Sequence, residues 1–240
     1  MKKLTFLFVV IMTVSLSINA YAADPVMVKD INSGAGGSGP IGMMKFDNQC
    51  YFFSNDGTNG RELWKTDGTE AGTQIIKDIN TNGDGGWYFG GITSLGAALN
   101  NKLYFGGNDG SSGNEFWITD GTANGTALVK DINRGSDNSA PGPYHIFGNK
   151  ILFRAWKGDS DCEPFISDGT ENGTVLLKEL VRKPKGVLKH KSSYPNSFMN
   201  LGDYCYFFAL VDDMEGYGLI RTDGTDNGTA LVTEAGYGYS

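Results

Sequence analysis

Several residue types are scarce in this 240-residue sequence, and each shortage excludes a class of protein. With two histidines and three cysteines, the sequence has neither the cysteine spacing of a zinc site nor a dense disulfide framework. Basic residues are outnumbered, with 20 Lys and Arg against 27 Asp and Glu, which disfavours general binding to nucleic acid. After residue 22, no apolar run approaches the roughly 20 residues that span a bilayer. We therefore expect no nucleic-acid partner and no membrane span in the mature protein.

The first 22 residues have the pattern of a secretory signal peptide. Lys2 and Lys3 precede an apolar stretch over residues 4–18, and a small-x-small cleavage pattern ends at Ala22. We predict cleavage near Ala22 and a secreted protein, periplasmic or extracellular.

Glycine, by contrast, is abundant at 35 residues, and Asn, Asp, Ser and Thr crowd around it. This is the composition of a turn-rich all-β protein, and no long pattern with a 3.6-residue period competes with it.

The most informative feature is a turn motif that occurs four times, about every 50 residues. The copies are TDGTEAGT (66–73), TDGTANGT (119–126), SDGTENGT (167–174) and TDGTDNGT (222–229). An aromatic strand precedes each copy, and a β-like run follows it. This period suits a four-stranded propeller blade. The sequence therefore predicts one all-β, propeller-like domain over residues 23–240, with repeats at about 33–80, 81–133, 134–180 and 181–235.

Within the first repeat, the pattern predicts strands at 41–46, 49–54, 61–66 and 74–79, joined by short hairpin loops. A fifth copy of the fourth strand, VMVKDIN at Val26–Asn32, lies before the first repeat. The surplus strand leaves two arrangements open, a closed four-bladed ring or a partial arc. An arc would expose strand edges and favour self-association.

These residues also carry a family resemblance. ELWKTDGTEAGTQIIKDIN and EFWITDGTANGTALVKDIN closely resemble the bacterial ELWxxDGT-repeat proteins, which occur in exported and surface chains. The third and fourth copies keep DGTxxGT but lose Leu-Trp. The resemblance covers essentially the whole mature chain, and it implies a propeller-like repeat fold and export but no particular activity.

The repeated residues are interpreted as structural. Because Asp-Gly is a turn pair and an active site occurs once per domain, we assign turn roles to Asp67, Asp120, Asp168 and Asp223. Trp64 and Trp117 are replaced by Phe165 and Ile220, which indicates packing between blades. Glu62, Glu115 and Glu163 are expected to form hydrogen bonds at the surface or at a strand edge. Cys50 and Cys205 share a position with Leu103 and Ile151, which favours buried packing, although a Cys50–Cys205 disulfide stays open.

Function is therefore sought in the parts that do not repeat. No cofactor is expected, although calcium could use the acidic hairpin loops that contain Asp56, Asp109 and Asp159. The long connections between repeats vary most, and some carry aromatic or basic residues that could bind a glycan or a protein. The aromatic candidates are Trp87, Tyr88, Phe89, Tyr144 and Tyr194, and Lys185 and Lys189 lie in a basic connection.

From these observations we expect an exported, non-catalytic repeat scaffold that binds a glycan or protein or associates with itself. The alternatives are a secreted hydrolase with paired carboxylates and a self-assembling structural surface protein.

Overall fold

The structure, a computed structural model, describes residues 24–86, 96–158, 161–181, 192–211 and 216–234. Sixteen strands in these residues form four antiparallel sheets, and each sheet contains four strands that follow one another in sequence. No helix that could cross a membrane occurs in the described ranges.

The first sheet contains β1 (Ile41–Phe46), β2 (Gln49–Asn55), β3 (Arg61–Thr66) and β4 (Gln74–Lys77). The second contains β5 (Gly96–Leu99), β6 (Lys102–Asn108), β7 (Asn114–Thr119) and β8 (Ala127–Lys130). The third contains β9 (His145–Phe147), β10 (Lys150–Trp156), β11 (Cys162–Ser167) and β12 (Val175–Leu176). The fourth contains β13 (Asn196–Leu201), β14 (Tyr204–Leu210), β15 (Tyr217–Thr222) and β16 (Ala230–Glu234).

The predicted all-β class and the four four-stranded repeats are confirmed. In the first repeat, the observed bounds of β1 and β3 coincide with the predicted strands, and β4 ends two residues before its prediction. The alternation of side chains between the two faces of each strand explains this success, because aromatic and β-branched residues mark both buried faces.

The predicted strand at Val26–Asn32 is wrong, because this segment is irregular in the structure. A strand needs a neighbouring strand to bond its backbone N–H and C=O groups. No strand among the described residues lies beside this segment to pair with it.

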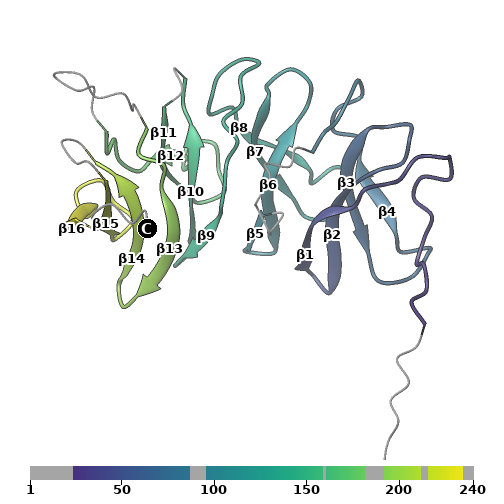
Figure 1. The fold of residues 1–240 in the computed structure, drawn as a ribbon, viewed down its shortest axis with the longest axis horizontal. Helices are drawn as coiled ribbons and strands as arrows, with labels where there is room; N and C mark the ends of the chain where they lie inside the picture. The colour runs from purple at the N-terminus through teal and green to yellow at the C-terminus, as the bar shows by residue number, and fades with distance from the viewer. Residues whose placement is uncertain (1–23, 87–95, 159–160, 182–191, 212–215, 235–240) are drawn as a thin grey trace, which may run out of the picture.

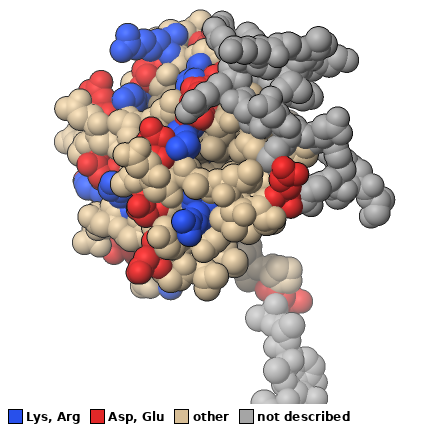
Figure 2. Space-filling model, turned by 90° about the vertical axis from the view of Figure 1, so that its left-hand side faces the viewer, with Lys and Arg blue, Asp and Glu red and all other residues tan. Residues whose placement is uncertain are grey.

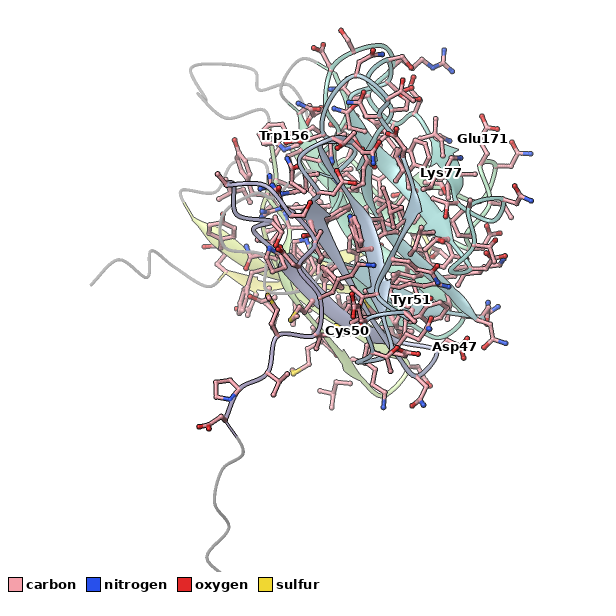
Figure 3. The ribbon with its side chains drawn as sticks, turned by 90° about the vertical axis from the view of Figure 1, so that its right-hand side faces the viewer. Asp47, Cys50, Tyr51, Lys77, Trp156 and Glu171 are labelled. Atoms are coloured by element: carbon pink, nitrogen blue, oxygen red, sulfur yellow. The ribbon has the colours of Figure 1, made fainter. Side chains whose placement is uncertain are left out.

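The four sheets stand in chain order as a fan, with the first and fourth sheets at its two ends (Figure 1). Consecutive up-and-down sheets that pack face to face are the arrangement of a β-propeller. Of the two arrangements that the sequence left open, the structure is the partial arc. Figure 3 views the end formed by the first sheet, where Cys50 and Tyr51 of β2 are labelled.

The hydrophobic core lies between the sheets and not within one central volume. One cluster joins Phe53 of the first sheet to Phe105 and Trp117 of the second. The next joins Phe116 of the second sheet to Phe153 of the third, with ring centroids 4.7 Å apart. A third cluster joins Leu152 to Cys205 of the fourth sheet. Each sheet is thus stabilised by its neighbours, as in other repeat architectures.

Candidate functional site

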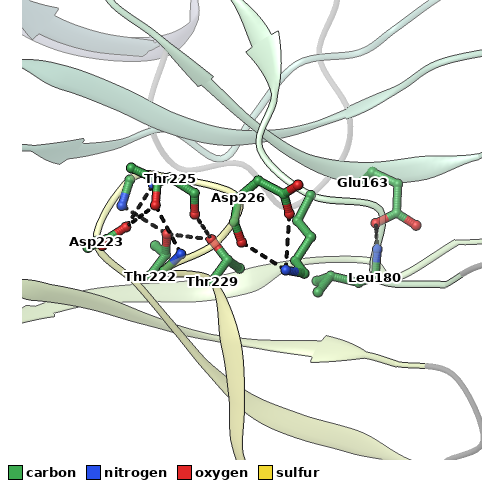
Figure 4. Close-up of polar contacts among 10 residues, drawn as sticks. Glu163, Leu180, Thr222, Asp223, Thr225, Asp226 and Thr229 are labelled. Atoms are coloured by element: carbon green, nitrogen blue, oxygen red, sulfur yellow. Dashed lines mark hydrogen bonds and ion pairs between the residues drawn. The ribbon is translucent and has the colours of Figure 1, made fainter.

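The repeated aspartates close tight turns, as predicted. Asp67 Oδ1 accepts hydrogen bonds from the N–H of Thr69 at 2.9 Å and from its hydroxyl at 2.7 Å. The hydroxyl of Thr73 donates to the carbonyl of Thr69 at 2.7 Å and lies 2.6 Å from the hydroxyl of Thr66. The other three copies repeat this network, and Figure 4 shows the one around Asp223. The carboxylates are therefore occupied by their own turns.

Both glycines of each turn are required by geometry. The first, represented by Gly68, has a φ of 90°, which side chains other than glycine rarely adopt. The second, represented by Gly72, lies against the carboxylate of Asp67, so that a Cβ atom there would overlap the carboxylate oxygens.

In the first three sheets, a lysine in the last strand or two residues after it ties the sheet to the turn of the next sheet. Lys77 donates from Nζ to the carbonyl of Thr126 at 2.8 Å, and Lys130 donates to the carbonyl of Thr174 at 2.7 Å. Lys178 donates to the carbonyl of Asp226 at 2.8 Å (Figure 4). This role was not predicted from the sequence, although the recurring lysine of the KDIN and KEL runs is a signal for it.

The repeated glutamates do form hydrogen bonds, but the prediction that they lie at the surface is wrong. Glu62 is fully buried in β3 and accepts from the N–H groups of Ile79, Asn80 and Gly85 at 2.8 to 3.3 Å. It thereby fixes the connection that leads to the second sheet. Burial raises the pKa of Glu62 to about 7, against the opposing effect of these N–H donors.

Glu115 and Glu163 hold the same position in the next two sheets and are also fully buried. Burial raises the pKa of Glu115 to about 7 and that of Glu163 to about 8. A side chain enclosed in this way positions backbone and does not face a substrate.

The hairpin loops considered for calcium use their carboxylates internally. Asp56 Oδ1 accepts from the N–H groups of Thr58 and Asn59 at 2.9 and 2.8 Å. Asp109 Oδ1 accepts from Ser111 and Ser112 in the same way. These bonds hold the pKa of both aspartates below its usual value, although burial opposes them. Asp159 lies outside the described residues.

A separate carboxylate cluster lies at the third sheet, in β11 and in the loops next to β11 and β12. Asp161, Glu163 and Glu179 place oxygen atoms within 4.8 Å of one another. Lys157 Nζ already pairs with Asp161 at 2.8 Å and with Glu179 at 2.9 Å. The ammonium group of Lys157 therefore balances part of the negative charge of this cluster.

The aromatic residues predicted to bind a glycan divide into two groups. Trp87, Tyr88 and Phe89 lie outside the described residues, as do Lys185 and Lys189. Tyr144 and Tyr194 are described, and both are half-buried.

Both described tyrosines make contacts with other aromatic rings, and glycan binding through them stays a prediction. Tyr144 packs in the core against Phe116 and Phe153, with ring centroids 6.1 and 5.7 Å away. Tyr194 meets Trp156 edge to face at 5.6 Å. Tyr144 is therefore part of the core, whereas Tyr194 is half-buried and makes this one aromatic contact.

The expected packing role of the tryptophan position is confirmed between the first two sheets. Trp117 is buried in the cluster that joins them, and its Nε1 has no hydrogen-bond partner among the described residues. Cys205 is fully buried, as predicted for its position, whereas Cys50 is half-buried. Both are free thiols, and they lie in the first and fourth sheets, at opposite ends of the fan.

The strongest candidate for a binding surface is the side of the fourth sheet that faces away from the third. We call it the trailing face and define it by Met199, Leu201, Tyr206, Phe208, Leu219 and Val232. The strand register aligns residues of this face with residues of the first sheet that are buried against the second sheet: Phe208 with Phe53, and Leu201 with Phe46. Figure 2 looks at this side, where acidic and basic residues are interspersed among uncharged ones, and the exposed Arg221 lies opposite Tyr206 on the same face.

Exposed fractions show how far the trailing face departs from the repeat. Phe208 is 38% exposed, whereas its counterpart Phe53 in the first sheet is 4% exposed. Leu201 is 63% exposed, against 9% for its counterpart Phe46. The first sheet buries these positions against the second, and the chain supplies no described sheet to cover the fourth.

Exposed large apolar side chains are concentrated at the two ends of the fan. Ten lie in the described ranges. Four of them lie in β1 or in the segment before it, which together we call the head; five lie in the fourth sheet, and Val175 is the exception. The head residues are Val26, Met27, Val28 and Met43, and those of the fourth sheet are Met199, Leu201, Phe208, Leu231 and Val232. Apolar patches of this kind mark interaction surfaces.

The fold and the open ends together define the class: a propeller-type repeat array with uncovered terminal faces. No family model matches the chain, and no curated protein matches it. Solved structures resemble its backbone. One is from a study of two prolyl endopeptidases (12% identity, TM-score 0.45, covering 78% of this chain and 25% of that one).

Two further structures are comparably similar. A putative TolB from Agrobacterium tumefaciens has 10% identity and a TM-score of 0.42, covering 77% of this chain and 60% of that one. A family 117 glycoside hydrolase produced by Zobellia galactanivorans has 11% identity and a TM-score of 0.38, covering 81% of this chain and 68% of that one. The chain thus spans a quarter of the first of these three proteins and less than two thirds of the second. At such identities and scores, the likeness says nothing about activity.

Proposed function

We propose that this chain is an exported, non-catalytic scaffold that binds another protein surface through the trailing face of its fourth sheet. One observation carries the proposal: Phe208 and Leu201 are exposed where the same repeat positions are buried against a neighbouring sheet. A protein surface is the partner that suits this face, because the other junctions of the array cover it with a sheet. Burying one such side chain contributes about 1.5–3 kcal/mol.

The repeated polar residues support a role without catalysis. Asp67 and its equivalents are bonded to their own turns, and Glu62 is bonded to a backbone connection. A carboxylate pair that hydrolyses a glycosidic bond has to face its substrate from two sides. The hydrolase alternative stays a prediction, and so does glycan binding through Trp87, Tyr88 and Phe89.

The test compares the association of three purified proteins. Light scattering of the mature protein from about 1 to 100 µM should show a mass that rises with concentration. Phe208→Glu places a charge in the trailing face and should hold the protein at the monomer mass. Val175→Glu is the matched control, because Val175 is 44% exposed but lies on β12, away from both ends.

Each result decides the proposal. Association that Phe208→Glu abolishes and Val175→Glu leaves intact supports the trailing face as a binding surface. A monomer at all concentrations in all three proteins, or equal association in all three, contradicts it. Circular dichroism and the melting temperature establish that each variant is folded.

A further inference from the structure

The segment before the first sheet makes the contacts that a preceding sheet would make. Lys29 donates from Nζ to the carbonyl of Thr73 at 2.7 Å, as Lys77 does to the carbonyl of Thr126. The segment therefore carries the lysine tie of a fourth strand.

The backbone that follows this segment also matches the connections between complete sheets. The carbonyl of Ser38 accepts from the N–H of Asn55 at 2.9 Å. The carbonyl of Gly85 accepts from Asn108 at the same distance, one sheet later. The described residues thus begin with a segment that makes two contacts of a last strand and its connection, although it is not a strand and no described strand pairs with it.

Apolar residues of the head are exposed because no described sheet covers them. Val28 holds the position of Ile76 and Val129 but is 45% exposed, whereas these two are 7% and 9% exposed. Met43 is 62% exposed, although its counterpart in the fourth sheet, Phe198, packs on Phe207 with centroids 5.1 Å apart.

The fourth sheet is complete but lacks the lysine that the head has. Its last strand, β16, carries Thr233 where the equivalent strands carry a lysine, so it lacks the residue that ties a sheet to the next one. Every residue of β16 is exposed, and Val232 is 48% exposed at the position of Val28. In the described residues, one end has a segment with the lysine of a fourth strand but no sheet beside it, and the other has a sheet whose fourth strand lacks the lysine.

We propose that the chain associates head to tail, so that the fourth sheet of one copy completes the missing sheet of a second copy. The segment Val26–Asn32 of the second copy takes the place of β16 beside β15, and its Lys29 keeps the bond to Thr73 of its own first sheet. This inference rests on the proposed function and names its partner as another copy of the chain. Two copies joined at both ends would make a ring of eight sheets, within the usual range of propellers.

The register of the fourth sheet supplies a direct test. Ala230 of β16 lies opposite Arg221 of β15, and Val26 holds the same position in its segment as Ala230 does in β16. If the segment replaces β16, Val26 of one copy lies opposite Arg221 of another. Both side chains are exposed, so cysteines there should leave the fold intact.

The experiment mixes two mature variants, Val26→Cys and Arg221→Cys, each in a Cys50→Ser background, and oxidises them. We expect a disulfide-linked dimer in the mixture and none with either variant alone. A linked dimer from Arg221→Cys alone would reveal tail-to-tail pairing and overturn the head-to-tail arrangement. A mixture that associates by light scattering but forms no mixed link would also overturn it, while the proposed binding face would stand.

A locked variant tests the exchange of strands. Arg221→Cys with Ala230→Cys in one chain, in the same background, joins β16 to β15 when oxidised. Association should be lost on oxidation and return after reduction. A locked protein that associates as strongly as the reduced one would overturn the replacement of β16.

Discussion

Lys29 donates a hydrogen bond from Nζ to the carbonyl oxygen of Thr73 at 2.7 Å, which fastens the segment before the first sheet to the turn of that sheet. Lys77 makes the same bond to Thr126 at 2.8 Å between two complete sheets. The array thus uses one contact both at its internal junctions and at its head. It combines a repeated strand residue with a repeated turn carbonyl, so one sequence unit provides both partners.

Replacing Lys77 by Met should lower the free energy of unfolding by about 1–2 kcal/mol, because a hydrogen bond from a charged donor is lost while most of the aliphatic packing is kept. Urea denaturation measures the change. Lys45→Met is the control, since Lys45 is an exposed lysine of β1, and its effect should stay within about 0.5 kcal/mol. Equal effects of the two substitutions would contradict the role of the tie.

Gly72→Ala should destabilise the protein by about 1–3 kcal/mol, because the new Cβ overlaps the Asp67 carboxylate and breaks the turn. Gly37→Ala provides the comparison, since a Cβ at Gly37 meets no atom within 4 Å. Thermal unfolding should separate the two variants clearly. A Gly72→Ala protein that melts with the wild type would show that the turn tolerates rearrangement.

Stability should fall as the pH rises from about 5 to 8, because of the buried glutamates. The folded protein raises the pKa of Glu62 from its ordinary 4.5 to about 7. The folded state therefore holds a proton that the unfolded state has released. The stabilisation is complete below the unfolded pKa and is lost as the pH passes the folded value.

Urea denaturation at several pH values measures this dependence. Glu62→Gln does not titrate and should flatten it, while Glu70→Gln, a change in an exposed turn, should leave it as in the wild type. A wild type whose stability rises over this pH range, with no difference in slope for Glu62→Gln, would contradict the assignment.

The repeated part of the fold could be predicted from the sequence because each feature appears several times. Turn residues at Asp67 and Gly68 and the aromatic positions of β2 identified strands and loops, and four copies identified the repeat. Glu62 was misplaced because a carboxylate is usually exposed, and only the tertiary path of the connection shows the three N–H groups that hold it.

The candidate site could not be predicted in the same way. Phe208 and Phe53 have nearly the same local sequence, and their difference in exposure depends only on whether another sheet follows. The segment Val26–Asn32 has the sequence of a strand but lacks a neighbour to pair with among the described residues. Such end effects arise from the number of repeats and their arrangement, which local patterns do not contain.

Tyr144 offers the clearest test of whether a residue predicted to bind a ligand is instead part of the core. Its ring packs against Phe116 and Phe153, while its hydroxyl is buried without a hydrogen-bond partner among the described residues. Tyr144→Phe keeps the ring and removes the unsatisfied hydroxyl, so it should be neutral or slightly stabilising. Tyr144→Ala leaves a cavity and should cost about 2–4 kcal/mol in urea denaturation. If Tyr144→Phe destabilises the protein as much as Tyr144→Ala does, the hydroxyl has a partner and the packing role is wrong.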